Sequence, residues 1–328
     1  MILDISRHKF HEALLTLFIF TTIAVVRAFT LSDELISHTA TMSSPIAETI
    51  MRWASQHTTI AALAVAPIFM NTVLSLARST VRTSLYPQNS MAAISLIALV
   101  IMGTTLTPNY PVAMLVALFT AQCLARLLYC FGPNSRYNKL FTAMLAAGIL
   151  PLLNGAMAIV SLLTLVIVII QRSTMRESII AVTGTLLPTF TYSYIDWLTG
   201  GSFLDTPLNI WGATHDFCMR PLVAYVTLPR LVLFGYLLFM YIITTSNYLS
   251  SRTTLNNSAR AAWPTLHVIT IACVATSVFI PSAAPFLLIC AAISVATMLP
   301  LMHQRIGDAL SAVAYIAFIG LSLYSLWA

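Results

Sequence analysis

Charged residues are scarce in this 328-residue chain, because Asp, Glu, Lys and Arg make up 8% of it, against about a quarter of an ordinary soluble domain. Glycine (11), proline (15) and cysteine (5) are too few for a collagen-like, disordered or disulfide-scaffold chain. Apolar residues account for 59% of the sequence. This composition excludes a soluble globular protein and leaves no room for a sizeable soluble domain.

The sequence also lacks the short motifs of common soluble enzymes. It contains no G-x-x-x-x-G-K-[ST] phosphate loop, no G-x-G-x-x-G, no G-x-S-x-G and no H-E-x-x-H. The cysteines are scattered without C-x-x-C spacing, so no metal site is predicted and no cofactor is identified. The net charge of +6 is typical of a polytopic membrane protein with basic cytoplasmic loops, so we expect no nucleic-acid partner.

Long apolar runs make up most of the sequence. A membrane-spanning helix needs about 20 mostly apolar residues. We therefore predict an all-α fold, a polytopic integral membrane helical bundle of about eleven transmembrane helices, which forms a single transmembrane domain over residues 1–328. The runs are 10–29, 59–77, 90–106, 111–131, 140–153, 156–170, 178–198, 222–246, 263–280, 284–302 and 309–327.

The distribution of charge predicts the orientation of these helices. With the N-terminus inside, 11 of the 16 basic residues fall in cytoplasmic segments, and every cytoplasmic connection is basic. The outer turns 107–110, 154–155 and 281–283 carry no charge, and six of the ten acidic residues fall on the outer side. Because basic residues accumulate in cytoplasmic loops, the sequence predicts an inner N-terminus and an outer C-terminus.

Two outer loops, about 30–58 and 199–221, are long enough to fold on the membrane surface. The first contains Ile46, Ile50, Met51 and Trp53 among charged residues. This pattern favours a short interfacial helix with Trp53 at headgroup depth. The alternative is a plain connecting loop.

Residues 140–170 form an almost uncharged segment that Pro151 and Asn154-Gly155 divide into runs of 14 and 15 residues. Each run would span only about 21 to 23 Å, short of a hydrocarbon core about 30 Å thick. The segment is therefore predicted as a pair of short helices or a re-entrant hairpin. Irregular backbone at this depth must be covered by protein or line a water-filled cavity. We therefore predict a polar cavity near Asn154. The alternative is a tight turn at a thinned membrane interface.

Acidic residues begin the first outer loop, where Asp33 and Glu34 follow the first predicted helix just beyond Arg27. A carboxylate there could take a proton from an acceptor hydroxyl or hold a divalent metal. We predict Asp33 and Glu34 as catalytic residues. The alternative is a pair of solvated loop acids.

Arginines near the outer ends of helices are the predicted substrate ligands. Arg230 follows Pro229 inside a predicted apolar run, where proline frees backbone groups and the guanidinium fork suits phosphate or carboxylate. An ion pair with Asp196 or an interfacial position is the alternative. The predicted substrate-binding residues are Arg27, Arg220, Arg230 and Asn154.

Several diffuse motifs between residues 60 and 200 support a first resemblance. They are Asn71, Arg82 to Pro87, Leu106-Thr107-Pro108, Leu140-Phe141 to Leu150-Pro151, Arg176-Glu177 and Gly184 to Pro188. This stretch resembles an uncharacterised family of polytopic inner-membrane proteins from Bacteroidota. The resemblance implies a multi-pass protein of the bacterial inner (cytoplasmic) membrane.

A second resemblance rests on the order of a first helix, outer Asp33-Glu34 and an interfacial segment. This order is similar to the start of the large class of membrane glycosyltransferases that use polyprenyl-phosphate sugars. That class places a catalytic acidic residue in its first outer loop, which implies a polyprenyl-phosphate-linked substrate and a membrane-lipid partner. The present chain departs from many members because it lacks a large C-terminal soluble domain.

These observations lead to three hypotheses about function. The first is an enzyme of envelope-glycan synthesis that transfers or polymerises a lipid-linked sugar at the outer face. The second is a transporter or flippase for a lipid or small anionic solute, with its cavity beside the short helices. The third is a non-catalytic membrane subunit whose protein partners the sequence does not identify.

Overall fold

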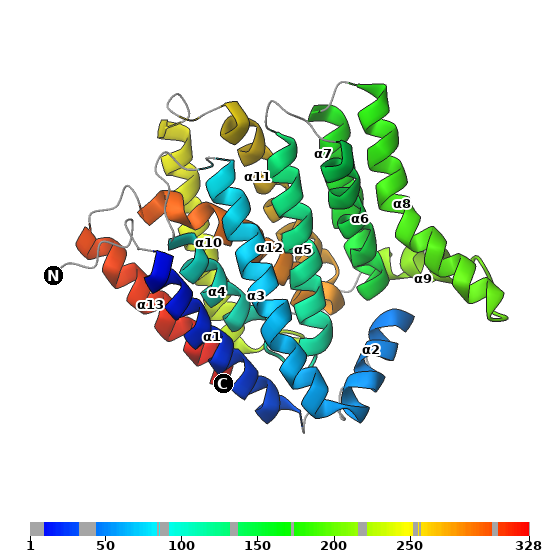
Figure 1. Cartoon of the computed structure of the whole chain (residues 1–328), viewed down its shortest axis with the longest axis horizontal. Helices are drawn as coiled ribbons and strands as arrows, with labels where there is room; N and C mark the ends of the chain where they lie inside the picture. Colours follow the sequence, from blue (N-terminus) through cyan, green and yellow to red (C-terminus); the bar gives the residue numbers. More distant parts are fainter. Residues whose placement is uncertain are drawn as a thin grey trace.

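The computed structural model describes residues 10–32, 44–83, 85, 92–131, 137–171, 174–215, 222–251, 255, 257–303 and 308–327, and within these ranges the regular elements are all helical (Figure 1). The α-helices are α1 (Phe10–Leu31), α2 (Pro45–Gln56), α3 (Thr58–Arg82), α4 (Ala92–Thr105), α5 (Tyr110–Cys130), α6 (Tyr137–Leu153), α7 (Ala158–Gln171), α8 (Met175–Leu198), α9 (Asp205–Thr214), α10 (Leu228–Ser251), α11 (Asn257–Phe279), α12 (Ala284–His303) and α13 (Asp308–Trp327). The 3₁₀ turns are η3 (Gly155–Met157), η4 (Leu222–Ala224) and η5 (Pro281–Ala283).

Each apolar run predicted from the sequence overlaps one of these helices. Among the described residues, six helices are long and apolar enough to cross a membrane, namely α1, α3, α5, α10, α11 and α12. Helices α4, α6, α7 and α13 are apolar but shorter, while α8 is long and contains Arg176, Glu177 and Asp196. The length and composition of the six helices support a membrane-embedded helical bundle.

Helices α4 and α12 occupy the centre of the bundle. Every side chain from Ala93 to Leu106 is buried, and nearly all of α12 as far as Pro300 is buried as well. These two helices pack against each other, and α1, α3, α5, α10, α11 and α13 surround them (Figure 1). The hydroxyls of Thr104 and Thr105 donate to carbonyls one turn earlier, at 2.7 Å each, so this core leaves them satisfied.

A second layer, formed by α6, α7 and α8, stacks on α5 and α11. Helices α6 and α8 approach closely because each has a glycine at their interface. A Cβ atom at Gly148 would lie 2.2 Å from the carbonyl oxygen of Thr185, and one at Gly184 would lie 2.9 Å from that of Phe141. Small residues commonly permit such close packing between membrane helices.

The helix ends form two groups at opposite ends of the bundle. Helices α3 and α5 end, and α8 and α11 begin, at the upper edge of Figure 1; we call this the basic end. It carries Arg78 and Arg82 of α3, Arg176 of α8 and Arg260 of α11. We call the opposite end, where α1, α4 and α8 end and α10 begins, the far end.

The predicted break near Asn154 is confirmed. Helix α6 ends at Leu153, Asn154 has extended backbone angles, and α7 begins after η3. Figure 1 shows α6 and α7 side by side, with the start of α6 and the end of α7 both towards the basic end. The segment is therefore an antiparallel pair of short helices.

Candidate functional site

The predicted site residues that the structure describes all lie at the far end. Arg27 is in the last turns of α1, Asn154 follows α6, and Arg230 is in the first turn of α10. The remaining predicted site residues lie outside the described residues; they are Asp33, Glu34 and Arg220.

Arg27 is half-buried and is held by two groups. Its Nη1 donates to Thr30 Oγ1 at 3.2 Å, and its guanidinium carbon lies 5.2 Å from the centre of the Trp327 ring at the end of α13. The Nε atom is buried and has no hydrogen-bond partner among the described residues. The guanidinium therefore makes a cation–π contact with α13.

Arg230 caps the central helix α4. Its Nη2 donates to the carbonyl oxygen of Leu106, which directly follows α4, at 3.0 Å. A cation is favourable at this position because the C-terminal end of a helix carries partial negative charge. The structure thus gives Arg230 a backbone partner directly after the end of α4.

The expectation that Pro229 lies inside a helix and frees backbone groups there is wrong. Helix α10 begins at Leu228, so Pro229 occupies its second position. A backbone N–H in the first turn has no partner within its own helix, and the missing N–H of Pro229 therefore costs no helical bond. The apolar run began upstream because residues 222–224 form the separate turn η4.

Helix α13, which contacts Arg27, and helix α10, which carries Arg230, meet around Gly103 of α4. Ser325 Oγ of α13 donates to the Gly103 carbonyl at 2.8 Å. A Cβ at Gly103 would lie 2.8 Å from the side chain of Leu233 on α10. Contacts therefore run from α1 through α13 and α4 to α10. We call this part of the far end the arginine site; it comprises Arg27, Leu106, Arg230 and Trp327.

The structure does not join Asn154 to the arginine site. Figure 1 shows α6 and α9 on the right of the bundle and α1 and α13 on the left. Asn154 is buried, and its Oδ1 accepts a hydrogen bond from the N–H of Ala156 at 3.2 Å. Its side chain holds the backbone of η3, and we now expect it to position neighbouring groups rather than to contact a substrate directly.

A small pocket lies beside this break, where the sequence predicted a polar cavity. Its free space is only about 10 Å³, roughly enough for one water molecule. Its polar lining comes from the start of α2, from α8 and from α9 rather than from Asn154. The lining residues are Ser44, Ile46, Pro151, Leu152, Gly155, Tyr192, Thr206, Asn209 and Ile210.

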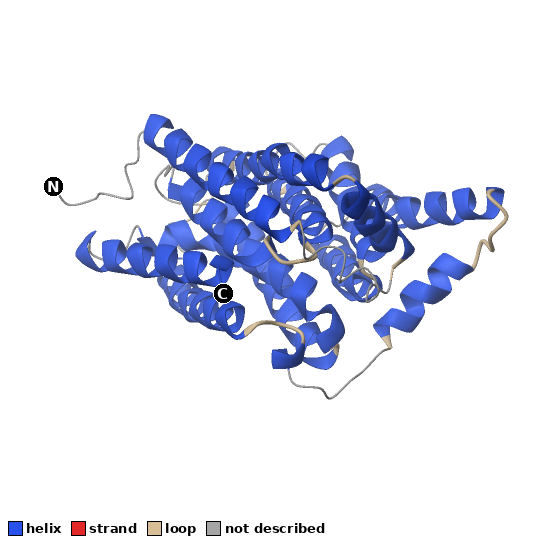
Figure 2. Ribbon diagram, turned by 90° about the horizontal axis from the view of Figure 1, so that it is seen from below, coloured by secondary structure: helices blue, strands red, loops and turns tan. Residues whose placement is uncertain are grey.

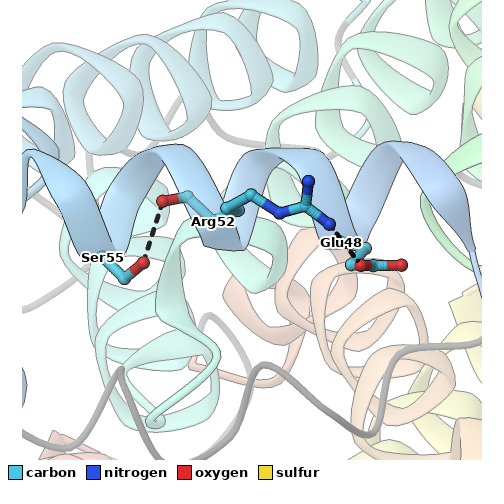
Figure 3. Close-up of polar contacts among 3 residues, drawn as sticks. All are labelled: Glu48, Arg52 and Ser55. Atoms are coloured by element: carbon cyan, nitrogen blue, oxygen red, sulfur yellow. Dashed lines mark hydrogen bonds and ion pairs between the residues drawn. The ribbon is translucent and has the colours of Figure 1, made fainter.

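The predicted interfacial segment forms the helix α2. Met51 is fully buried against the bundle, whereas Trp53 is 45% exposed. Figure 3 shows Arg52 reaching back to Glu48, at 2.7 Å between Nη2 and Oε1, and Ser55 Oγ donating to the Arg52 carbonyl at 2.8 Å. Because this ion pair is exposed, it contributes little to stability. Arg52 is therefore a suitable arginine at the far end to compare with Arg27 and Arg230.

Sequence reasoning missed Trp327 and the polar face of α9. An aromatic residue near the end of the last helix was a signal for Trp327, since such residues anchor helix ends, but nothing local related it to Arg27. Thr206 and Asn209 lie in the outer segment 199–221, which the sequence treated as a loop, although α9 occupies its middle. Within the described residues, no group of three or more His, Cys, Asp or Glu side chains is arranged to hold a metal ion.

Comparison of the chain with protein-family models, curated proteins and solved structures gave no match. The two resemblances drawn from the sequence therefore stay predictions. The chemistry of the far end follows from its own residues: two guanidinium groups held by adjoining helices, and a separate, uncharged pocket beside α9.

Proposed function

We propose that the protein is a multi-pass protein of the bacterial inner membrane, crossed by eleven helices with the N-terminus inside and the C-terminus outside. The basic residues at one end of the bundle support this orientation, since such residues remain on the cytoplasmic side. The contact between Arg27 and Trp327 places the end of α13 beside that of α1, at the far end. In this orientation the far end faces outwards.

A reporter fused after Ala328 tests the orientation. We expect a reporter that is active only outside the cytoplasm to be active, and one that fluoresces only inside to be dark. Fusions after Arg82, at the basic end of α3, provide the opposite control. A cytoplasmic signal from the C-terminal fusion would contradict the proposed topology.

We infer that the arginine site binds the phosphate of a lipid-linked substrate. We propose that the protein transfers or polymerises a polyprenyl-linked sugar at the outer face. The observation that carries this proposal is the placement of Arg27 and Arg230 on helices that adjoin through α4 and α13. Arginine is well suited to phosphate because its planar fork donates two parallel hydrogen bonds. At the outer ends of helices, this chemistry lies at the depth of lipid headgroups.

The proposed reaction assigns the acids and the arginines different tasks. One of the two acids that follow α1 in the chain, Asp33 or Glu34, accepts the proton of the acceptor hydroxyl. The hydroxyl oxygen forms a bond to the anomeric carbon of the donor sugar, and the bond from that carbon to the phosphate oxygen breaks. The electron pair of that bond stays on the phosphate, where the guanidinium groups stabilise the charge.

Binding of a polyprenyl phosphate to the purified full-length protein in detergent tests this proposal. We expect Arg27→Ala and Arg230→Ala each to raise the Kd about tenfold or more, because a hydrogen bond to a charged group contributes about 1.5–3 kcal/mol and about 1.4 kcal/mol is tenfold in affinity. Lysine at either position should retain part of the affinity, since it keeps the charge without the fork.

Arg52→Ala is the matched control, because Arg52 lies at the same end on α2 and its loss should leave the Kd nearly unchanged. An equal effect of all three alanine variants would indicate general attraction of an anion by the surface. Unchanged affinity in Arg27→Ala and Arg230→Ala would remove the phosphate site.

A further inference from the structure

A pair of amide side chains lies on the outer surface of the bundle, halfway along two neighbouring helices. Helices α3 and α5 lie side by side on the near face of Figure 1, and both are long and apolar enough to cross a membrane. Asn71 is close to the midpoint of α3, and Gln122 is close to the midpoint of α5. Asn71 is exposed and Gln122 is half-buried. When these helices cross a bilayer, both amides lie near the middle of the hydrocarbon layer, on a surface that lipid chains reach.

The two amides satisfy each other only in part. Gln122 Nε2 donates to Asn71 Oδ1 at 3.5 Å, which is long for a hydrogen bond. Neither amide has another hydrogen bond within the described part of the chain. An amide side chain has two N–H donors and a carbonyl acceptor, so Asn71 Nδ2 and Gln122 Oε1 remain for another partner. Lipid chains offer none, and an unpaired polar group in an apolar surrounding is costly.

Towards the basic end, the same surface of α3 and α5 becomes positively charged. Arg78 is exposed two turns beyond Asn71, and Arg126 is half-buried one turn beyond Gln122. At 1.5 Å per residue, these arginines lie about 10 Å and 6 Å nearer to the basic end than the amides. Among the described residues, neither arginine is paired with an acidic side chain. We call this surface the amide face; it comprises Asn71, Arg78, Gln122 and Arg126.

The halves of α3 and α5 nearer to the far end have a different surface. From Ile60 to Met70 on α3, and from Pro111 to Phe119 on α5, every exposed or half-buried side chain is apolar. Lipid chains are a suitable surrounding for these halves. The amide face instead needs a partner that brings polar groups into the membrane.

The chemistry of the amide face indicates a transmembrane helix with two features. Asparagine, glutamine, serine and threonine side chains form hydrogen bonds between membrane helices, so the partner needs one of these at the depth of Asn71 and Gln122. Acidic side chains within membranes pair with basic ones, so the partner also needs a carboxylate about two turns nearer to the basic end, beside Arg78 and Arg126.

A symmetric pair of copies of this chain does not meet the second requirement. In a two-fold pair, the same patch of both subunits forms the interface. The amides would then find each other, but Arg78 and Arg126 would lie against the arginines of the other copy. Because like charges in contact are unfavourable, the face is better matched to a different membrane protein.

We propose that the amide face binds a transmembrane helix of another membrane protein, which presents an amide or hydroxyl to Asn71 and Gln122 and a carboxylate to Arg78 and Arg126. This proposal requires that α3 and α5 cross the membrane. It does not rest on the sugar transfer proposed above, because the amide face and the arginine site share no residue.

Binding of synthetic transmembrane peptides to the labelled full-length protein in phosphatidylcholine vesicles tests this inference, with energy transfer as the readout. The probe peptide has about 20 residues, all leucine except for a central asparagine and a glutamate two turns along. We expect it to bind at least about tenfold more tightly than an all-leucine peptide, equivalent to about 1.4 kcal/mol. A peptide with lysine in place of glutamate should bind as weakly as the all-leucine one. Equal binding of the three peptides would overturn the proposal.

Variants of the protein locate the binding to the amide face. Asn71→Leu combined with Gln122→Leu should weaken binding of the probe peptide about tenfold. The melting temperature in detergent should not fall, because no buried contact is lost. Arg78→Glu should weaken binding of the glutamate peptide and strengthen binding of the lysine peptide, which simple apolar contact would not do. It also keeps the test open if the double leucine variant folds poorly. Unchanged binding in both variants would contradict the assignment to this face.

Thr183→Leu is the matched control for the leucine variants. Helix α8 lies at the right side of the bundle in Figures 1 and 2, away from α3. The exposed Thr183 hydroxyl donates within its own helix, to the carbonyl of Ile179 at 2.8 Å, so its loss should leave peptide binding unchanged. Arg52→Glu at the far end is the control for the charge reversal.

Self-association is measured in the same vesicles, by energy transfer between two differently labelled copies of the protein. We expect the signal to be the same for the wild type and for Asn71→Leu with Gln122→Leu. A signal that is present in the wild type and lost in this variant would assign the amide face to a second copy of the chain, and would overturn the proposal of a different partner.

Discussion

Replacing Gly148 by alanine should markedly lower the thermal stability of the purified protein in detergent. The added Cβ would lie 2.2 Å from the carbonyl oxygen of Thr185 and 2.9 Å from its carbonyl carbon. Both are backbone atoms of α8, so no side-chain rotation relieves the contact and the two helices must separate. Overpacking of this kind costs about 1–3 kcal/mol and occasionally more.

Gly235→Ala and Gly320→Ala are the controls for this experiment. They lie on α10 and α13, and a Cβ at either position would meet no atom within 4 Å. Alanine is about 0.8–1.0 kcal/mol more favourable than glycine in a helix interior, so these variants should match or exceed the wild type in melting temperature. If Gly148→Ala behaves like them, the close approach of α6 and α8 is wrong.

The double substitution Asp33→Asn with Glu34→Gln should abolish transfer of sugar from a polyprenyl-linked donor. General acid–base catalysis contributes about 10²–10⁴-fold to a rate, and a carboxamide cannot accept the acceptor proton. Membrane abundance should be unchanged. Binding of a polyprenyl phosphate should persist or strengthen, because two negative charges that follow α1 in the chain are removed.

Glu48→Gln is the matched control at the same end of the protein. Its carboxylate is exposed and pairs with Arg52 on α2, so transfer should continue nearly as in the wild type. Full transfer by the double variant would remove the case for catalysis by these acids. The transporter or flippase hypothesis would then lead, and movement of a labelled lipid across vesicles would be the next measurement.

Local features of the sequence were enough to locate the long apolar helices, although they missed α9. Apolar runs identified them because a helix in an apolar surrounding needs apolar side chains along most of its length. The break at Asn154 was predictable because proline, asparagine and glycine cluster there. The start of α10 was not predictable, since the apolar residues of η4 belong to the same apolar run. Composition alone cannot show where η4 ends and α10 begins.

The side-chain contacts of the arginine site could not be predicted from local features of the sequence. Arg27 meets Trp327, and Arg230 meets the carbonyl of Leu106. Such pairs depend on which helices are neighbours, and nothing in the periodicity of one helix specifies its partner. For the same reason the sequence predicted polar chemistry near Asn154 but did not indicate that α8 and α9 supply it.

The burial of α4 has a consequence for the biogenesis of the protein. This helix is only 14 residues long, or about 21 Å, and protein surrounds it on all sides in the finished bundle. Yet α12 and α13, which pack against it, follow it in the chain by well over a hundred residues and leave the ribosome after it. In the proposed topology α4 therefore enters the bilayer before these helices are made, and because the bilayer is thicker than α4 is long, this has a modest energetic cost per ångström of mismatch. The side chains of α4 are all apolar except for a serine and two threonines. They are therefore compatible both with lipid, before α12 and α13 are made, and with the protein core afterwards.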